Sequence, residues 1–191
     1  MTNEHKQVFA PGSAKCGALL KWWRSLDERR GDRATLRRCR NPTEVAFNPA
    51  FHRLRRSVGF QDAKSWESEA MAVIAGVVSH IKEYNGRRKF AEQMGANIAG
   101  GDRKVLSELR FRRLLTTHSR EELYVPLVRT IGLLGKRANV CDVAYSIYYW
   151  GDWMRKRWAY DYYGGLVDEG TDVAETQGSG ESQQTLLGGE R

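Results

Sequence analysis

The residue types that most often carry out chemistry form no recognisable site in this sequence of 191 residues. Its histidines are isolated, with no second histidine four residues away and no cysteine beside them. A metal centre needs several ligands that converge on one point, so the pattern predicts no metal and no cofactor. The histidines are His5, His52, His80 and His118.

The cysteines Cys16, Cys39 and Cys141 are far apart and odd in number. Such spacing indicates neither a zinc site nor a disulfide framework. Residues 132–137 (GLLGKR) superficially resemble a phosphate-binding loop, but they are too few and lack the Ser or Thr of that motif. With no Gly-x-Ser-x-Gly motif either, we expect a protein that is not an enzyme.

The charge of the chain is informative. The formal net charge is +8, but residues 166–191 hold six acidic residues and one basic residue. The rest of the chain therefore carries 30 Lys and Arg against 17 Asp and Glu, or +13. An excess of this size favours a polyanion as partner. A charge that only maintains solubility, or an acidic protein partner, are the alternatives.

Five short clusters of basic residues carry much of this charge. Arginine can contact phosphate with two parallel hydrogen bonds, and interleaved Tyr or Trp can stack on exposed bases. The clusters therefore favour nucleic-acid binding, although each one alone is also typical of a solvated helix face. The clusters are Arg37, Arg38 and Arg40; Arg53, Arg55 and Arg56; Arg110, Arg112 and Arg113; Lys136 and Arg137; and Arg155, Lys156 and Arg157.

The elements that position these clusters are predicted to be helices, because apolar residues recur at intervals of three and four. No alternating strand pattern and no internal repeat is found, so the predicted class is all-α. We expect helices over residues 13–30, 33–39, 49–58, 65–85, 105–117, 119–134 and 139–164. The weak boundary at Gly100-Gly101 predicts two small packed helical bundles, residues 13–100 and 101–164. The acidic residues 165–191 are too polar to form a core and are predicted to be a disordered tail.

The helix expected over 139–164 is the most distinctive element. Its apolar face holds Val143, Ile147, Trp150, Met154 and Trp158. Tyrosine and basic residues occupy the other side, where Tyr149 and Tyr160 could stack on bases or simply pack. No apolar run approaches the roughly 18 residues of a membrane span, and the first residues lack a hydrophobic signal region. We expect a cytoplasmic protein without a membrane partner.

Three stretches together resemble a known family. They are residues 36–54 (LRRCRNPTEVAFNPAFHRL), residues 109–134 (LRFRRLLTTHSREELYVPLVRTIGLL) and the ending WGDWMRKRWAYDYY. Over about residues 15–164 the chain resembles the CasB family, the small subunit of the type I-E CRISPR surveillance complex Cascade. No single motif is specific, so the resemblance depends on the order and spacing of all three.

The resemblance implies two small helical bundles and a non-catalytic role, with more than one copy lying beside the CRISPR RNA backbone subunits. It implies as partners the other Cascade subunits, CRISPR RNA, the target and non-target DNA strands and another copy of the chain. Family members stabilise the R-loop by holding DNA, notably the displaced non-target strand. Because the guide reads the sequence by base pairing, backbone contact suffices for the subunit.

Arg37, Arg38 and Arg129 match basic positions of the family pattern. Family members carry Lys or Arg directly after the Trp-Gly of the last helix, whereas Trp150-Gly151 is followed here by acidic Asp152. The basic cluster comes one turn later. The predicted nucleic-acid-binding residues are Arg37, Arg38, Arg53, Arg113, Arg129, Lys136, Arg137, Arg155, Lys156 and Arg157.

Two other functions remain open from the sequence. A stand-alone helical DNA-binding regulator would need a recognition helix aimed at base edges, and no helix-turn-helix spacing is found. A structural adaptor would use the arginine clusters against acidic protein surfaces.

Overall fold

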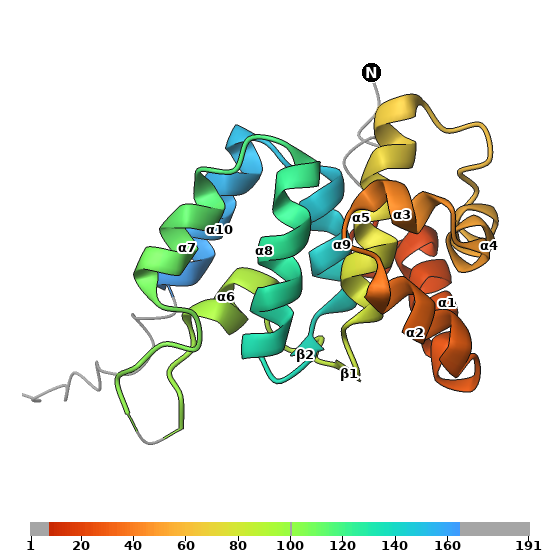
Figure 1. Cartoon of the computed structure of the whole chain (residues 1–191). Helices are drawn as coiled ribbons and strands as arrows, with labels where there is room; N and C mark the ends of the chain where they lie inside the picture. The colour runs from red at the N-terminus through yellow and green to blue at the C-terminus, as the bar shows by residue number, and fades with distance from the viewer. Residues whose placement is uncertain (1–7, 100, 165–191) are drawn as a thin grey trace, which may run out of the picture.

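The structure is a computed structural model of the chain, and it describes residues 8–99 and 101–164. Within them the chain forms ten helices and one pair of two-residue strands, so the predicted all-α class is confirmed (Figure 1). No helix in this part of the chain is long and apolar enough to cross a membrane. The predicted disordered tail, residues 165–191, lies outside the described residues. The elements are α1 (Ala14–Glu28), α2 (Arg30–Arg38), α3 (Pro42–Ala46), α4 (Pro49–Ser57), α5 (Ser65–Ser79), β1 (Glu83–Tyr84), α6 (Phe90–Gly95), α7 (Glu108–Leu115), α8 (Arg120–Leu133), β2 (Arg137–Ala138), α9 (Val140–Tyr148) and α10 (Asp152–Gly164).

Polar side chains cap the starts of α8 and α4. The side chain of Ser119 accepts a hydrogen bond from the backbone N–H of Glu122 at 3.1 Å, which begins α8. Asn48 accepts from the N–H of Ala50 at 2.9 Å, with Pro49 in the first turn of α4. Such bonds satisfy backbone donors that have no partner inside the helix.

Helix α5 lies at the centre of the molecule. All its residues from 70 to 79 are buried, and it packs against α2, α3, α8 and α9. Figure 1 shows α1 to α4 on one side, α6, α7 and α10 on the other, and α5, α8 and α9 between them. The buried apolar side chains form one continuous cluster from Phe9 to Tyr162. The division into bundles at residues 100 and 101 stays a prediction.

The helix predicted over 65–85 is too long. Helix α5 ends at Ser79, and residues 83–84 form β1, which pairs in parallel with β2. The carbonyl of Ile81 leaves the helical path to accept hydrogen bonds from Trp23 Nε1 at 3.0 Å and Arg33 Nη1 at 3.1 Å. These donors come from α1 and α2, so local sequence does not show where the helix stops.

The single helix predicted over 139–164 is also wrong, because α9 ends at Tyr148 and α10 begins at Asp152. The Arg120 guanidinium of α8 donates to the carbonyls of Ile147 at 3.0 Å and Tyr148 at 2.9 Å. These carbonyls are thus satisfied at the end of α9 without a further helical turn. The predicted apolar face is nevertheless buried, from Val143 to Trp158.

Candidate nucleic-acid interface

A hollow of about 520 Å³ lies between α7 and α8. Its apolar lining includes Leu106, Leu114 and Leu133, and three arginines contribute to its wall. We call this hollow the α7/α8 groove. The arginines are Arg110 and Arg113 of α7 and Arg129 of α8.

The three groove arginines are exposed, and none forms an ion pair or a side-chain hydrogen bond with another described residue. Their neighbour Arg112 differs, because it pairs with Glu108 one turn earlier on α7 and does not line the groove. Unpaired like charges around one hollow repel each other, and an anion placed between them relieves that repulsion. The groove is thus suited to a phosphate or a carboxylate.

A second basic hollow, of about 330 Å³, lies near the C-terminal end of α8. Its lining includes Arg87, Arg88, Arg137 and Leu134, and Leu134 directly follows the groove residue Leu133 in the chain. Both hollows therefore have a lining residue at the C-terminal end of α8. Of the three arginines here, Arg137 is paired with Glu83 at 3.1 Å.

A third basic group lies where α2 and the end of α5 approach the turn before β2. Arg37 Nε donates to the carbonyl of Ser79 at 2.9 Å, and burial lowers the pKa of Arg37. Burial, together with the nearby positive charges of Arg37 and Lys136, lowers the pKa of His80 to about 4. The carbonyl of Lys136 accepts from the backbone N–H of Lys82 at 2.8 Å, so Arg37 and Lys136 both lie beside the segment that contains His80.

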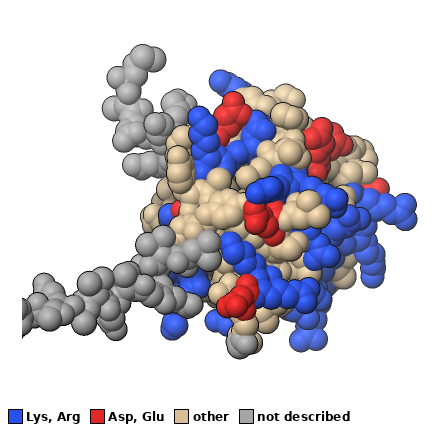
Figure 2. Space-filling view, turned by 90° about the vertical axis from the view of Figure 1, so that its left-hand side faces the viewer, with Lys and Arg blue, Asp and Glu red and all other residues tan. Residues whose placement is uncertain are grey.

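Positive charge gathers on one side of the molecule. Figure 2 shows Lys and Arg side chains crowded on the right of the view, the side that faces the viewer in Figure 1. We define the basic belt as the groove arginines, the second hollow and the third group. Its members are Arg110, Arg113, Arg129, Arg87, Arg88, Arg137, Lys136 and Arg37.

The structure does not bring every predicted residue into the belt. Arg53 of α4 pairs with Asp32 of α2 and lines a separate hollow with residues of α1. Arg155 pairs with Asp152 and donates to the carbonyl of Leu115 at 3.3 Å. Arg38 and Lys156 are exposed without a side-chain partner among the described residues.

Arg157 is occupied by the fold. It pairs with the buried carboxylate of Asp142 and lies 3.5 Å from Asp161. Asp142 also accepts from the backbone N–H of Phe90 at 2.7 Å, so this carboxylate joins α9 to the start of α6 and the middle of α10. Arg157 therefore stabilises the contact between α9 and α10.

The two tyrosines left open by the sequence differ. The Tyr149 hydroxyl accepts from the backbone N–H of Val8 at 3.2 Å, and its ring lies 4.8 Å from that of Tyr145 between ring centroids. Tyr149 thus packs within the protein. Tyr160 of α10 is 78% exposed, and its contact with bases stays a prediction.

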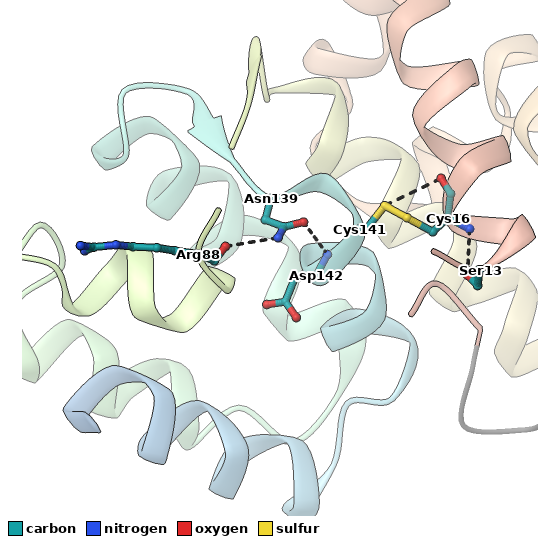
Figure 3. The surroundings of a disulfide bond; sticks show 6 residues. All are labelled: Ser13, Cys16, Arg88, Asn139, Cys141 and Asp142. Atoms are coloured by element: carbon teal, nitrogen blue, oxygen red, sulfur yellow. Dashed lines mark hydrogen bonds between the residues drawn. A yellow bond between two sulfur atoms is a disulfide. The ribbon is translucent and has the colours of Figure 1, made fainter. Parts of the chain in front are cut away.

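Arg87 and Arg88 are not among the predicted residues. Figure 3 shows the backbone carbonyl of Arg88 accepting a hydrogen bond from Asn139, while its side chain extends away from that bond. The signal that could have found them is the run of three basic residues at 87–89. That run comes at the start of a short helix expected to end at about Met94, and its sequence does not indicate which way the arginines face.

The expectation of no disulfide is wrong. Cys16 of α1 and Cys141 of α9 form a disulfide with Cα atoms 5.6 Å apart, although 125 positions separate them in the chain (Figure 3). Both cysteines are buried where α1 packs against α9, and Cys39 is the free cysteine of the described residues. Spacing along the chain carries no information about such a contact, because the fold alone creates it.

The chain was compared with known proteins. Residues 32–163 match the family model described as CRISPR-associated protein Cse2. The fold is similar to a chain in the crystal structure of E. coli Cascade bound to a PAM-containing dsDNA target, at 22% identity and TM-score 0.62, over 78% of this chain and 93% of that one. It is also similar to CasB from Thermus thermophilus, at 21% identity and TM-score 0.56, over 76% and 96%. No curated protein is significantly similar. Identities this low show a shared fold.

Proposed function

The chain belongs to the Cse2 family of CRISPR-associated proteins, and on that premise we propose that it is a non-catalytic, cytoplasmic subunit of a type I-E Cascade complex. In this proposal its partners are the other Cascade subunits, CRISPR RNA, the two DNA strands and a second copy of the chain. Its task is to hold nucleic-acid backbone and so stabilise the R-loop, including the displaced non-target strand.

The observation that carries the proposal is the open charge of the α7/α8 groove. Other arginines of α7 and α10 form ion pairs with carboxylates: Arg112, Arg155 and Arg157. Arg110, Arg113 and Arg129 instead surround one hollow without a partner among the described residues. Arginine binds phosphate oxygens through two parallel N–H bonds. The second hollow, with Arg87 and Arg88 in its lining, also has a lining residue at the C-terminal end of α8, so further cations lie near that end of the groove.

The groove offers little with which to read a base sequence. The Thr130 hydroxyl, the one side-chain hydroxyl in its lining, donates to the carbonyl of Pro126 at 2.9 Å within α8. Contacts to phosphate fix position but carry no sequence information. Backbone binding of this kind suits a complex in which the guide reads the sequence by pairing.

The test is fluorescence anisotropy with random-sequence single-stranded and duplex DNA across a salt series. Contact with about five phosphates on a single strand predicts a slope of about −3.5 in log affinity against log salt, or about 100-fold between 50 and 200 mM. Binding that ignores salt would contradict a phosphate partner.

The two rival functions give different results. A structural adaptor for acidic proteins would show no affinity for DNA alone, and its complexes would survive nuclease treatment in a pull-down. A stand-alone regulator would bind one duplex sequence far more tightly than random DNA. The proposal requires similar affinity for all sequences.

A further inference from the structure

The segment that follows the described fold has the opposite charge to the fold. Residues 165–191 hold six acidic residues and one basic residue, whereas the rest of the chain carries an excess of 13 positive charges. The family match ends at residue 163, so this segment also lies outside the part shared with the family. It contains a pair of adjacent leucines, Leu186-Leu187.

The segment begins close to the α7/α8 groove. Helix α10, which ends at Gly164, packs against α7: the ring of Tyr162 stacks on that of Phe111 at 3.8 Å between centroids. Tyr162 also donates to the carbonyl of Leu106 at 2.6 Å, and the Tyr163 hydroxyl lies 3.1 Å from a carboxylate oxygen of Glu108. The groove lies on another side of α7, so about one helix diameter, about 10 Å, separates the two.

The segment is long enough to reach the groove. A chain of n residues can span at most about 3.3–3.6 Å times n. For the residues from 165 to 186 this upper limit is roughly 75 Å, far more than the width of α7. A ligand tethered to the same chain competes at an effective concentration of about 1 mM.

The chemistry of the segment matches that of the groove. Carboxylates form the same paired hydrogen bonds with arginine as phosphates do, and the groove arginines have no carboxylate partner among the described residues. The Leu186-Leu187 pair offers apolar surface to a lining that includes Leu106, Leu114 and Leu133. The hollow beside Arg53 is a poorer match, because Arg53 already pairs with Asp32.

We propose that residues 165–191 bind in the α7/α8 groove of their own chain and compete there with nucleic acid. The proposal rests on the nucleic-acid binding proposed above for the same groove. The segment acts as an internal substitute for the phosphate backbone: it covers the arginines when no strand is present, and a strand displaces it. The segment outcompetes nucleic acid that binds weakly and non-specifically to the groove. Inside the assembled complex the local concentration of a strand is high, so the strand displaces the segment.

The first experiment keeps the chain at full length and removes only charge, with Asp168→Asn, Glu169→Gln, Asp172→Asn and Glu175→Gln combined. A tethered competitor weakens apparent affinity by one plus the ratio of its effective concentration to its own Kd. An internal Kd of about 0.2 mM at an effective concentration of about 1 mM therefore predicts about sixfold tighter binding of single-stranded DNA in 50 mM salt. The gain should disappear by about 0.5 M salt, where charges are screened. Unchanged affinity, with wild-type protein binding DNA as proposed, would overturn the competition and leave the proposed function standing.

The second experiment asks whether the segment uses this groove. The same charge removal is repeated in a chain with Arg110→Gln, Arg113→Gln and Arg129→Gln, where the gain in DNA affinity should vanish. An equal gain in that background would show a general charge effect and overturn docking in the groove. If the wild-type protein bound no DNA, the proposed function would fail, and backbone amide NMR shifts of Thr130 to Leu133 would decide the docking. Shifts between the wild-type and charge-removed chains support it, and identical spectra overturn it.

Discussion

Replacing Arg113 and Arg129 by glutamine together should weaken DNA binding by an amount that depends steeply on salt. Each phosphate contact on a single strand contributes about 0.7 to the salt slope, so losing two changes the slope from about −3.5 to about −2.1. The electrostatic contribution to affinity vanishes at about 1 M salt. Relative to that reference, each contact raises the DNA affinity about eightfold at 50 mM and about threefold at 200 mM salt. The double variant should thus lose about 65-fold at 50 mM but about 10-fold at 200 mM, measured by anisotropy on random single-stranded DNA.

The matched control is Arg112→Gln, one position from Arg113 on the same helix. Arg112 pairs with Glu108 and does not line the groove, so its replacement should leave both the affinity and the slope almost unchanged. The reasoning is refuted if both variants lose affinity equally, because net charge alone would then explain binding. It is refuted as well if the double variant loses the same factor at both salt concentrations, which would indicate altered folding.

Three further outcomes follow from contacts away from the groove. Cys16→Ser should lower the free energy of unfolding in urea by about 2–5 kcal/mol without reductant, because the disulfide closes a long loop. In dithiothreitol the variant and the wild-type chain should be equally stable. Cys39→Ser should have no such effect. His80 has a pKa of about 4 in the folded chain against an ordinary value of 6.5. The unfolded chain therefore takes up a proton first, and the free energy of unfolding should fall as pH drops from about 6.5 to 4. His80→Gln should remove that part of the pH dependence, and DNA bound at the nearby cations should raise the His80 pKa measured by NMR. Arg157→Gln leaves a buried carboxylate without its cation and should cost about 1–3 kcal/mol in thermal unfolding, with the salt slope of DNA binding unchanged.

Much of the helical fold follows from local sequence. The apolar stripe of α5 and the caps at Asn48 and Ser119 depend on residues within one or two turns, and periodicity and capping rules describe them. The ends of α5 and α9 do not, because Ile81 and Ile147 accept their hydrogen bonds from side chains of distant helices. A sequence pattern with no strand signal likewise cannot locate a strand pair as short as β1 and β2.

The candidate site was predictable as charge but not as geometry. The basic clusters include Arg113 and Lys136, and the family resemblance adds Arg129; all three are exposed in the structure. The same criterion marks Arg155 and Arg157, whose charges the structure pairs with Asp152 and Asp142. Whether an arginine meets a carboxylate depends on which helices are neighbours, and that information is absent from the spacing of basic residues.

The difference between paired and open arginines is a stronger argument for an anionic ligand than the net charge is. Arg157 is held by two carboxylates at the junction of α9 and α10, so its replacement should affect folding. Arg110, Arg113 and Arg129 line one hollow, where they repel each other and form no ion pair with the described residues. An anion in the groove converts that repulsion into binding energy. The acidic residues 165–191 and a phosphate backbone are the two sources of such an anion argued above, and the affinity of the charge-removed chain separates them.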